Sequence, residues 1–224
     1  RLLGRGMEAE RVVVTGNPAF DGLFSEHNKV AAQRFLDSKC WGKLSCILWA
    51  GHAEPYNHPQ TSVPAGMSLP LEIERVLREH VIANDELCLV VRYHPSDWYR
   101  YPRHSPHPRI HFSETPHELL HPLLQASAIV VVQNSTVGLE AAIVGIPVLA
   151  IENSPSAQDE FNLVRLGVAS PCLTPAELPQ RLTEILQQNY SIPTDYATDG
   201  GSAARVADVL ISMLKTSCSI NPLS

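Results

Sequence analysis

The segment over 128–151 constrains the fold more than any other part of the chain. An apolar, largely β-branched run over 128–132 ends abruptly in the polar turn 133–136. A short helical segment follows over 137–144, and a second apolar run follows over 146–151. A strand–helix–strand unit with such short connections predicts two parallel strands that are buried on both faces.

The polar turn of this unit lies at the carboxyl end of its first strand, where open α/β sheets bind ligands. Ser135 occupies the N-cap position of the predicted helix, so it either caps the helix alone or also helps to bind an anion there. Glu140 follows about one and a half turns later. It is either a solvated helix residue or a carboxylate that binds sugar hydroxyls, and its small, apolar flanks indicate a tight place in which it needs a partner.

The rest of the chain alternates between further strands and helices, which predicts an α/β fold with a doubly wound, Rossmann-like parallel sheet. The expected strands cover 11–15, 45–50, 87–93 and 109–112. The expected helices cover 28–38, 71–82, 116–125, 158–166, 175–188 and 201–214. Thr174 is the expected N-cap of the helix that begins at Pro175. We expect one domain over 1–216 and a frayed tail over 217–224.

Three predicted strands end in polar residues, at His52, His94 and Ser135. Because the carboxyl ends of parallel strands share one edge of a sheet, these residues are expected to converge on one cleft. Two imidazoles and a helix N-terminus suit a phosphorylated ligand. Arg92 either neutralises a phosphate in this cleft or faces a helix.

Composition excludes several classes of protein. The net charge of −6 argues against a nucleic acid as the main partner. No apolar run reaches the roughly 20 residues of a membrane span, and no secretory signal peptide is visible. The chain opens on Arg1, within what looks like a helix end, so we interpret it as a fragment of a longer protein. The sequence leaves the oligomeric state open.

Cysteine and histidine usage favours neither disulfides nor a metal. The five cysteines are scattered, no pair has metal-ligand spacing, and their odd number argues against a disulfide framework. Reduced thiols in a cytoplasmic protein are the expectation. His104 and His107 lie in a proline-rich loop that does not fix their spacing, so no metal site is expected.

Five motifs, in the same order along the chain, resemble the C-terminal domain of the GT-B superfamily, which contains nucleotide-sugar glycosyltransferases and the non-hydrolysing UDP-N-acetylglucosamine 2-epimerases. The segment 11–21, RVVVTGNPAFD, resembles the valine-rich TGN-x-x-x-D segment of the epimerases. The loops at Gly51-His52 and Tyr93-His94-Pro95 are similar to their two histidine loops. The segments NSTVGLEAA, over 134–142, and DGGSAARV, over 199–206, resemble their DSGG-x-x-EEA and GDG-x-A-x-x-RI motifs.

The chain departs from the epimerase pattern at three places. Ala53 replaces the arginine after the first histidine, Thr136-Val137 replaces the diglycine, and Ala141 replaces the second glutamate. The segment from Asn134 onward and the His94-Pro95 pair look as much like capsular-polysaccharide transferases that use a CMP-activated acidic sugar. Lipid-A-disaccharide synthase is a more distant resemblance, through Gly16-Asn17-Pro18.

The resemblance implies a set of roles for individual residues. Ser135 with the N–H groups of Thr136 and Val137 would hold a phosphate, and Glu140 would accept hydrogen bonds from ribose. His94 would contact phosphate or sugar, and His52 would stabilise a leaving phosphate, as the tentative catalytic residue. In the first and last motifs, Gly16 and Asn17 would let the backbone approach the ligand, Arg205 would pair with an acid or simply solvate its helix, and Asp21 would be structural.

The resemblance therefore implies the nucleotide-sugar-binding domain of a glycosyltransferase or 2-epimerase of bacterial surface polysaccharide assembly. The expected substrate is a UDP-sugar, with a CMP-sugar as the alternative, and no cofactor or metal is implied. The expected partner is a missing N-terminal domain, and the parent protein is expected in the cytoplasm, with peripheral association at the inner membrane face as an option. A non-catalytic nucleotide- or sugar-binding domain is the alternative of another class. A dinucleotide-dependent oxidoreductase is disfavoured because Gly16 begins no G-x-G-x-x-G motif.

Overall fold

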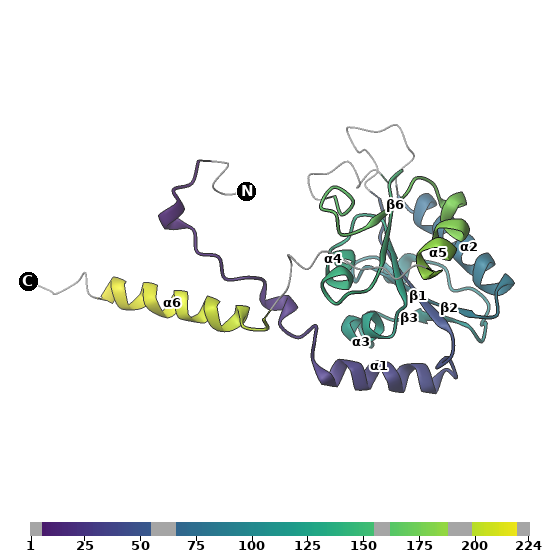
Figure 1. Cartoon of the computed structure of the whole chain (residues 1–224), viewed down its shortest axis with the longest axis horizontal. Coiled ribbons are helices and arrows are strands. Elements are labelled where there is room, and N and C mark those ends of the chain that lie inside the picture. The colour runs from purple at the N-terminus through teal and green to yellow at the C-terminus, as the bar shows by residue number, and fades with distance from the viewer. Residues whose placement is uncertain (1–5, 55–65, 155–161, 188–198, 219–224) are drawn as a thin grey trace, which may run out of the picture. The chain divides into compact units, whose positions relative to one another are not determined.

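The computed structural model describes residues 6–54, 66–154, 162–187 and 199–218. The chain divides into two compact units, one formed by Arg1–Phe24 with Ala197–Ser224 and the other by Ser25–Tyr196. Each unit is described by itself below (Figure 1). The interpretation of residues 1–216 as one nucleotide-sugar-binding domain stays a prediction, and most of the predicted tail, from residue 219, lies outside the described residues.

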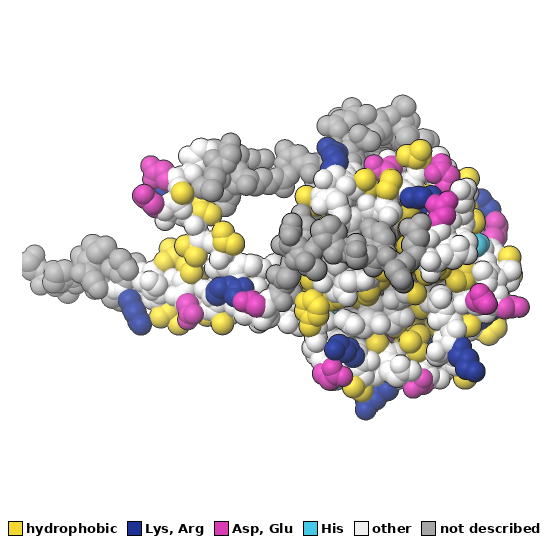
Figure 2. Space-filling view, viewed as in Figure 1, with side chains coloured by type: hydrophobic (Ala, Val, Ile, Leu, Met, Phe, Trp, Pro, Cys, Tyr) yellow, Lys and Arg dark blue, Asp and Glu magenta, His cyan; other side chains and the backbone are white. Residues whose placement is uncertain are grey.

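The smaller unit consists of two short 3₁₀ helices, η2 (Ala9–Arg11) and η3 (Pro18–Phe20), and the long helix α6 (Ser202–Cys218). The predicted strand over 11–15 is wrong, because residues 12–15 have no regular secondary structure, none of the described strands pairs with them, and Val14 is 87% exposed. Hydrophobic side chains also lie exposed along α6, as Figure 2 shows, and among them are Leu210, Met213 and Leu214.

The larger unit is built on a six-stranded parallel sheet in the order β3-β2-β1-β4-β5-β6. Its strands are β1 (Ser45–Gly51), β2 (Leu87–Tyr93), β3 (Ile110–Ser113), β4 (Ile129–Val132), β5 (Val148–Ile151) and β6 (Ser170–Cys172). The helices are α1 (Glu26–Ser38), α2 (Ser68–Ala83), α3 (Leu120–Gln125), α4 (Thr136–Ile143) and α5 (Leu178–Gln187), with the 3₁₀ helices η4 (Trp98–Arg100) and η6 (Pro175–Glu177). This confirms the predicted doubly wound α/β fold.

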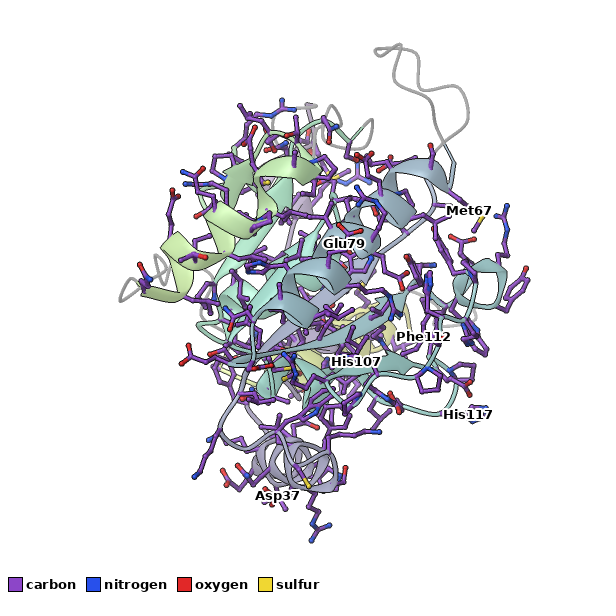
Figure 3. The ribbon with its side chains drawn as sticks, turned by 90° about the vertical axis from the view of Figure 1, so that its right-hand side faces the viewer. Asp37, Met67, Glu79, His107, Phe112 and His117 are labelled. Carbon is purple, nitrogen blue, oxygen red and sulfur yellow. The ribbon has the colours of Figure 1, made fainter. Side chains whose placement is uncertain are left out.

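Helices cover both faces of the sheet. Helices α2 and α5 lie side by side over one face, which Figure 3 views from outside, and their apolar side chains form one core with Ile47, Trp49 and Val131 of the strands. Helices α1, α3 and α4 belong to the opposite layer, where α1 packs against α3 and α4 packs on β4 and β5. Burial on both faces explains why the central strands are almost purely apolar.

The structure corrects several predicted elements. Residues 163–167 form turns rather than the end of the predicted helix over 158–166, whose first residues lie outside the described part. Helix α3 begins only at Leu120, and residues 115–117 before it form a turn. Strand β6 was missed because three residues with a central proline carry no strand pattern, and its place at the sheet edge tolerates Pro171.

The helix predicted from Pro175 begins instead as the 3₁₀ helix η6, which leads into α5. Thr174 precedes it as predicted, but its side chain accepts no hydrogen bond from the helix backbone. Its hydroxyl donates to Glu177 at 3.2 Å instead.

The described cysteines Cys40, Cys46, Cys88 and Cys172 are free thiols, and all but the first are buried. Cys46 and Cys88 are register partners on β1 and β2. The hydrogen bond with Cys88 and, after it, burial raise the pKa of the Cys46 thiol. None of the described helices is long and apolar enough to cross a membrane.

Candidate functional site

The direction in which successive strands are added to the sheet reverses between β1 and β4. From β1 the chain adds β2 and β3 on one side, and it then adds β4, β5 and β6 on the other side. Such a switch point leaves a crevice beyond the carboxyl ends of the two central strands. Ser135 lies there, directly before α4, and its hydroxyl accepts a hydrogen bond from the Val137 N–H at 3.3 Å. The structure therefore confirms the predicted N-cap, with Thr136 as the first residue of the helix.

His52 follows β1 on the other side of the crevice. Its backbone N–H donates to Gln133 Oε1 at 3.0 Å, and its ring Nδ1 lies 3.1 Å from the Ala53 carbonyl oxygen. Because a carbonyl oxygen only accepts, this contact places a proton on Nδ1. The other ring nitrogen, Nε2, is buried and has no hydrogen-bond partner among the described residues.

Gln133 belongs to a buried polar cluster that the sequence did not reveal. Its side-chain nitrogen donates to Glu54 Oε1, which also accepts from the Ser154 hydroxyl at 2.6 Å. The three residues follow β4, β1 and β5, so the cluster joins the ends of three strands. The only signal in the sequence was that a polar residue follows each apolar strand. The cluster fixes the backbone of His52 at the crevice.

His94 follows β2, and its backbone N–H donates to the Gly51 carbonyl at 2.9 Å. Its ring Nδ1 accepts from the Ser96 N–H at 3.2 Å and lies 2.8 Å from the Ser96 hydroxyl. Since Nδ1 is the acceptor, the proton of the neutral ring is on Nε2. His94 is exposed, so this N–H is available to an anionic ligand.

Two adjoining hollows connect these residues. A cavity of about 220 Å³ is lined by His52, His94, Ser135 and Val137 together with Arg92 and parts of β1, β2 and α3. A more open hollow of about 380 Å³ shares the first three of these and adds Thr136 among its lining residues. The structure thus brings together the three strand ends that the sequence predicted would converge.

Arg92 is a buried cation in the wall of the smaller cavity. Its Nη1 donates to the Ser113 hydroxyl at 2.7 Å. Burial lowers the pKa of Arg92, and the charge of Glu118 opposes that shift. Burial also acts to raise the pKa of Glu118, but hydrogen bonds from His111 and Ser113, with the charges of His111 and Arg92, lower it overall.

Glu140 lies on α4 but is not among the residues that line either hollow. Its Oε2 is 3.3 Å from Nε2 of His121 on α3, and the carboxylate is mostly buried. Burial raises its pKa, which His121 partly counteracts. Glu140 thus has the partner that its apolar flanks required, and the sequence did not identify His121 as that partner.

The remaining predicted site residues, Gly16, Asn17 and Arg205, belong to the smaller unit. Gly16 has a φ of +82°, and a Cβ there would lie 2.5 Å from the Ser202 hydroxyl. The Asn17 side chain accepts from the Ala19 N–H at 3.0 Å and so caps η3. Arg205 donates to the Thr15 carbonyl at 2.9 Å and to Asp199 at 2.6 Å. A ligand contact of these residues stays a prediction.

Asp21 has the structural role that the sequence predicted. Its two carboxylate oxygens accept from the backbone N–H groups of Ser202 at 3.1 Å and Ala203 at 2.8 Å. These are the first two residues of α6, whose N–H groups have no partner within the helix. Asp21 therefore caps a helix that begins 181 residues later in the chain.

In the described ranges, no group of three or more His, Cys, Asp or Glu side chains is arranged to hold a metal ion. His104 lies 3.5 Å from the buried Glu74, which also accepts from Tyr93 at 2.5 Å and Arg78 at 2.6 Å. His107 accepts from the Arg109 N–H at 3.2 Å. The two histidines thus have separate partners.

Comparison with solved structures identifies the architecture. The S. aureus MnaA–UDP co-structure matches with a TM-score of 0.64 and 19% identity over 96% of this chain. The UDP-GlcNAc 2-epimerase from Neisseria meningitidis, bound to UDP-GlcNAc, matches with a TM-score of 0.61 and 18% identity over 94%. The wall teichoic acid polymerase TagF matches with a TM-score of 0.62 and 15% identity over 95%. The chain therefore has the Rossmann-like fold of one part of these GT-B structures.

The GT-B fold confirms the resemblance that the sequence motifs carried. This chain spans 56%, 58% and 55% of the lengths of those three proteins. No family model matches the sequence, and no curated protein matches it. The assignment therefore rests on the strand order, the motifs and the structural similarity together.

Proposed function

We propose that this GT-B chain is the nucleotide-sugar-binding domain of a glycosyltransferase or a UDP-N-acetylglucosamine 2-epimerase-like enzyme of bacterial surface polysaccharide biosynthesis. The observation that carries the proposal is the convergence of His52, His94 and Ser135 on the hollows at the β1/β4 switch point. The titles of two structural neighbours, which name UDP and UDP-GlcNAc as bound ligands, support a UDP-sugar as the substrate.

In this proposal the phosphate lies at the N-terminus of α4. The N–H groups of Thr136 and Val137 and the Ser135 hydroxyl bind it, and the positive end of the helix dipole favours its charge. The Nε2–H of His94 donates to the same phosphate or to the sugar. His52 lines the cavity. It stabilises the charge that develops on a leaving phosphate when its Nε2 carries a proton and donates that proton in a hydrogen bond to the phosphate.

A second domain, absent from this chain, supplies the acceptor site or the acid–base carboxylates in this proposal. Two observations support it. The chain spans only 56%, 55% and 58% of the lengths of three structural neighbours. The smaller unit also carries a hollow of about 720 Å³ between the segment over 10–15 and α6, lined in part by Val209, Leu210 and Met213. The chain alone is therefore expected to bind a nucleotide without catalysing a reaction of the nucleotide sugar. The proposed location of the parent protein is the cytoplasm.

Calorimetric titration of the chain with UDP, CMP, GDP, ADP and NAD tests the proposal. UDP is expected to bind, and at about 100 times its Kd it should stabilise the fold by about 2.7 kcal/mol. Ser135→Ala should weaken UDP binding at least tenfold, and Glu140→Ala should do so if that carboxylate contacts ribose. Arg75→Ala, on the exposed face of α2, is the control that should bind like the wild type.

The outcomes of this panel separate the alternatives. Tighter binding of CMP than of UDP would favour a CMP-sugar-dependent transferase over an enzyme that uses a UDP-sugar. Binding of NAD alone, or UDP binding that is unchanged in Ser135→Ala, would contradict the proposed site. Binding of UDP by a full-length parent protein that turns over no nucleotide sugar would instead favour the non-catalytic binding domain.

A further inference from the structure

The guanidinium of Arg92 is a buried charge with an incomplete set of partners. The residue is only 9% exposed, and arginine is almost never buried to that extent unless it is paired. Within the described ranges, the Ser113 hydroxyl alone accepts a hydrogen bond from it, and no carboxylate oxygen lies within 4 Å. A guanidinium has five N–H donors, so most of them are unused.

The nearest acid, Glu118, is already occupied. Both of its oxygens lie within 3.0 Å of His111 Nε2, and Ser113 also hydrogen-bonds to it. The charge of Glu118 acts on Arg92 from beyond hydrogen-bond distance. This arrangement orients Arg92 and leaves its remaining donors without an anionic partner from this layer of the protein.

Arg92 lines the cavity of about 220 Å³ from β2, and Ser135 and Val137 at the start of α4 also line it. His52 is another lining residue, and its buried Nε2 has no hydrogen-bond partner among the described residues. Apolar groups such as Leu120 form much of the rest of the wall, which strengthens any charge–charge interaction inside.

We propose that this cavity is a second anion subsite, in which Arg92 binds an oxyanion of the ligand other than the phosphate at the N-terminus of α4. The planar fork of arginine suits a carboxylate or a phosphate with two parallel N–H···O bonds. The oxyanion is either the second phosphate of a nucleoside diphosphate or a carboxylate on its sugar. This proposal rests on the proposed function in one respect, because the proposed function supplies the identity of the ligand that carries the oxyanion.

The test compares wild type and Arg92→Gln by calorimetry with UMP, UDP, UDP-glucose and UDP-glucuronic acid. If the subsite binds the second phosphate, Arg92→Gln weakens UDP at least tenfold and leaves UMP unchanged. If it binds a sugar carboxylate, the variant weakens UDP-glucuronic acid at least tenfold more than UDP-glucose. Equal affinities in both proteins for every probe, or equal losses for UMP and UDP, would overturn the proposal.

Inorganic phosphate separates failure of the subsite from failure of the proposed function. Phosphate should raise the melting temperature of the wild type and of Ser135→Ala, and Arg92→Gln should lose that part of the shift. A chain that binds phosphate through Arg92 but binds no nucleotide contradicts the proposed function alone. A phosphate shift that is unchanged in Arg92→Gln contradicts the subsite alone.

Two further variants complete the design. Arg75→Gln removes an exposed arginine that is paired with Glu79 on α2, and it should bind every probe like the wild type. Arg92→Met has an unbranched, uncharged side chain that fills similar space. Arg92→Met replaces Arg92→Gln if the glutamine variant does not fold. The same losses of affinity are expected of it, and the same results would overturn the proposal.

Discussion

At the residue scale, Gly138 shows why one position of the NSTVGLEAA motif is restricted. It lies on α4 where the helix approaches the sheet, and a Cβ there would be 2.5 Å from Leu163 Cδ1 and 3.2 Å from Val132 Cγ2. The end of the Leu163 side chain can move aside, but the β-branched Val132 side chain, or the helix itself, must shift by a few tenths of an ångström. Glycine at this position therefore lets the N-terminus of α4 lie close to the switch point.

Gly138→Ala is expected to destabilise the chain by about 1–3 kcal/mol, the usual cost of overpacking a core. Urea denaturation measures the loss. Gly42→Ala is the matched control, since the nearest atom to a Cβ there is 3.9 Å away, and its stability should change by no more than about 0.5 kcal/mol. Equal stabilities of the two variants would contradict this packing argument.

Gln133 illustrates what a buried polar side chain contributes at the same scale. It is 1% exposed, it accepts from the His52 N–H, and it donates to Glu54. Gln133→Leu is expected to cost about 2 kcal/mol or more, because it leaves a buried N–H and a buried carboxylate with fewer partners. Chemical denaturation checks this value.

Gln180→Leu is the control for Gln133→Leu. Gln180 is exposed on α5 and donates to Glu184 at 2.8 Å, so the loss of this bond should be nearly neutral. If both glutamine variants were equally stable, the buried cluster would contribute nothing to the end of β4.

Sequence reasoning predicted the positions of some candidate site residues but not the contacts of others, for a definite reason. His94 directly follows β2 and two residues separate Ser135 from the end of β4, so local pattern alone placed them at the sheet edge. The partners of His52 and Glu140 were out of reach, because Gln133 lies 81 residues from His52 and the contact of His121 with Glu140 depends on how α3 packs beside α4. Such contacts are set by packing rather than by local spacing.

At the element scale, α6 depends on carboxylates outside the helix. Hydrogen bonds from Ala203 and Ser202 lower the pKa of Asp21, and Arg205 adds to the effect. A hydrogen bond from Arg205 and one from the Gly201 N–H lower the pKa of Asp199 to about 2. Both groups are ionised when they hold the first turn of the helix.

This arrangement predicts an acid-sensitive start of α6. Because the folded-state pKa values lie below the unfolded ones, the stabilisation is complete above about pH 4 and is lost as the pH falls toward about 2. Amide exchange at Ser202 and Ala203 should therefore accelerate over that range. Circular dichroism of α6 should decrease in parallel.

Asp21→Asn should accelerate hydrogen exchange at the amides of Ser202 and Ala203 at neutral pH. It should also remove most of the effect of acid on the protection of these amides. Asp208→Asn, on an exposed position of α6, is the control and should behave like the wild type. Identical exchange in the two variants would show that Asp21 does not cap the helix.

Elements with a strong periodic pattern were the ones that could be predicted. Strand β2 has the bounds that the sequence indicated, Leu87–Tyr93, and α1 and α2 differ from expectation by a few residues. The valine-rich run over 11–15 carries an equally strong strand signal but pairs with no strand in the part of the chain that the structure describes. Strand pairing depends on the tertiary fold rather than on the local sequence. Strand β6 is an example in the other direction, because its three residues form a strand only by pairing with β5.

At the scale of the whole molecule, the order of the strands brings motifs that are far apart in the sequence to one candidate site. The sequence predicted a parallel sheet and therefore a shared carboxyl edge. It could not give the order β3-β2-β1-β4-β5-β6, which places the residues after β1, β2 and β4 next to one another. That order also places Arg92 beside the N-terminus of α4 in the wall of one cavity.

The most direct test of the account is hydrogen exchange of the whole chain, read by mass spectrometry, with and without saturating UDP. Bound nucleotide should protect the backbone amides over 134–138 and 93–96, and Ser135→Ala should reduce the protection over 134–138. Absence of protection in both segments under conditions in which UDP binds, or protection confined to 199–218, would contradict a nucleotide site at the β1/β4 switch point.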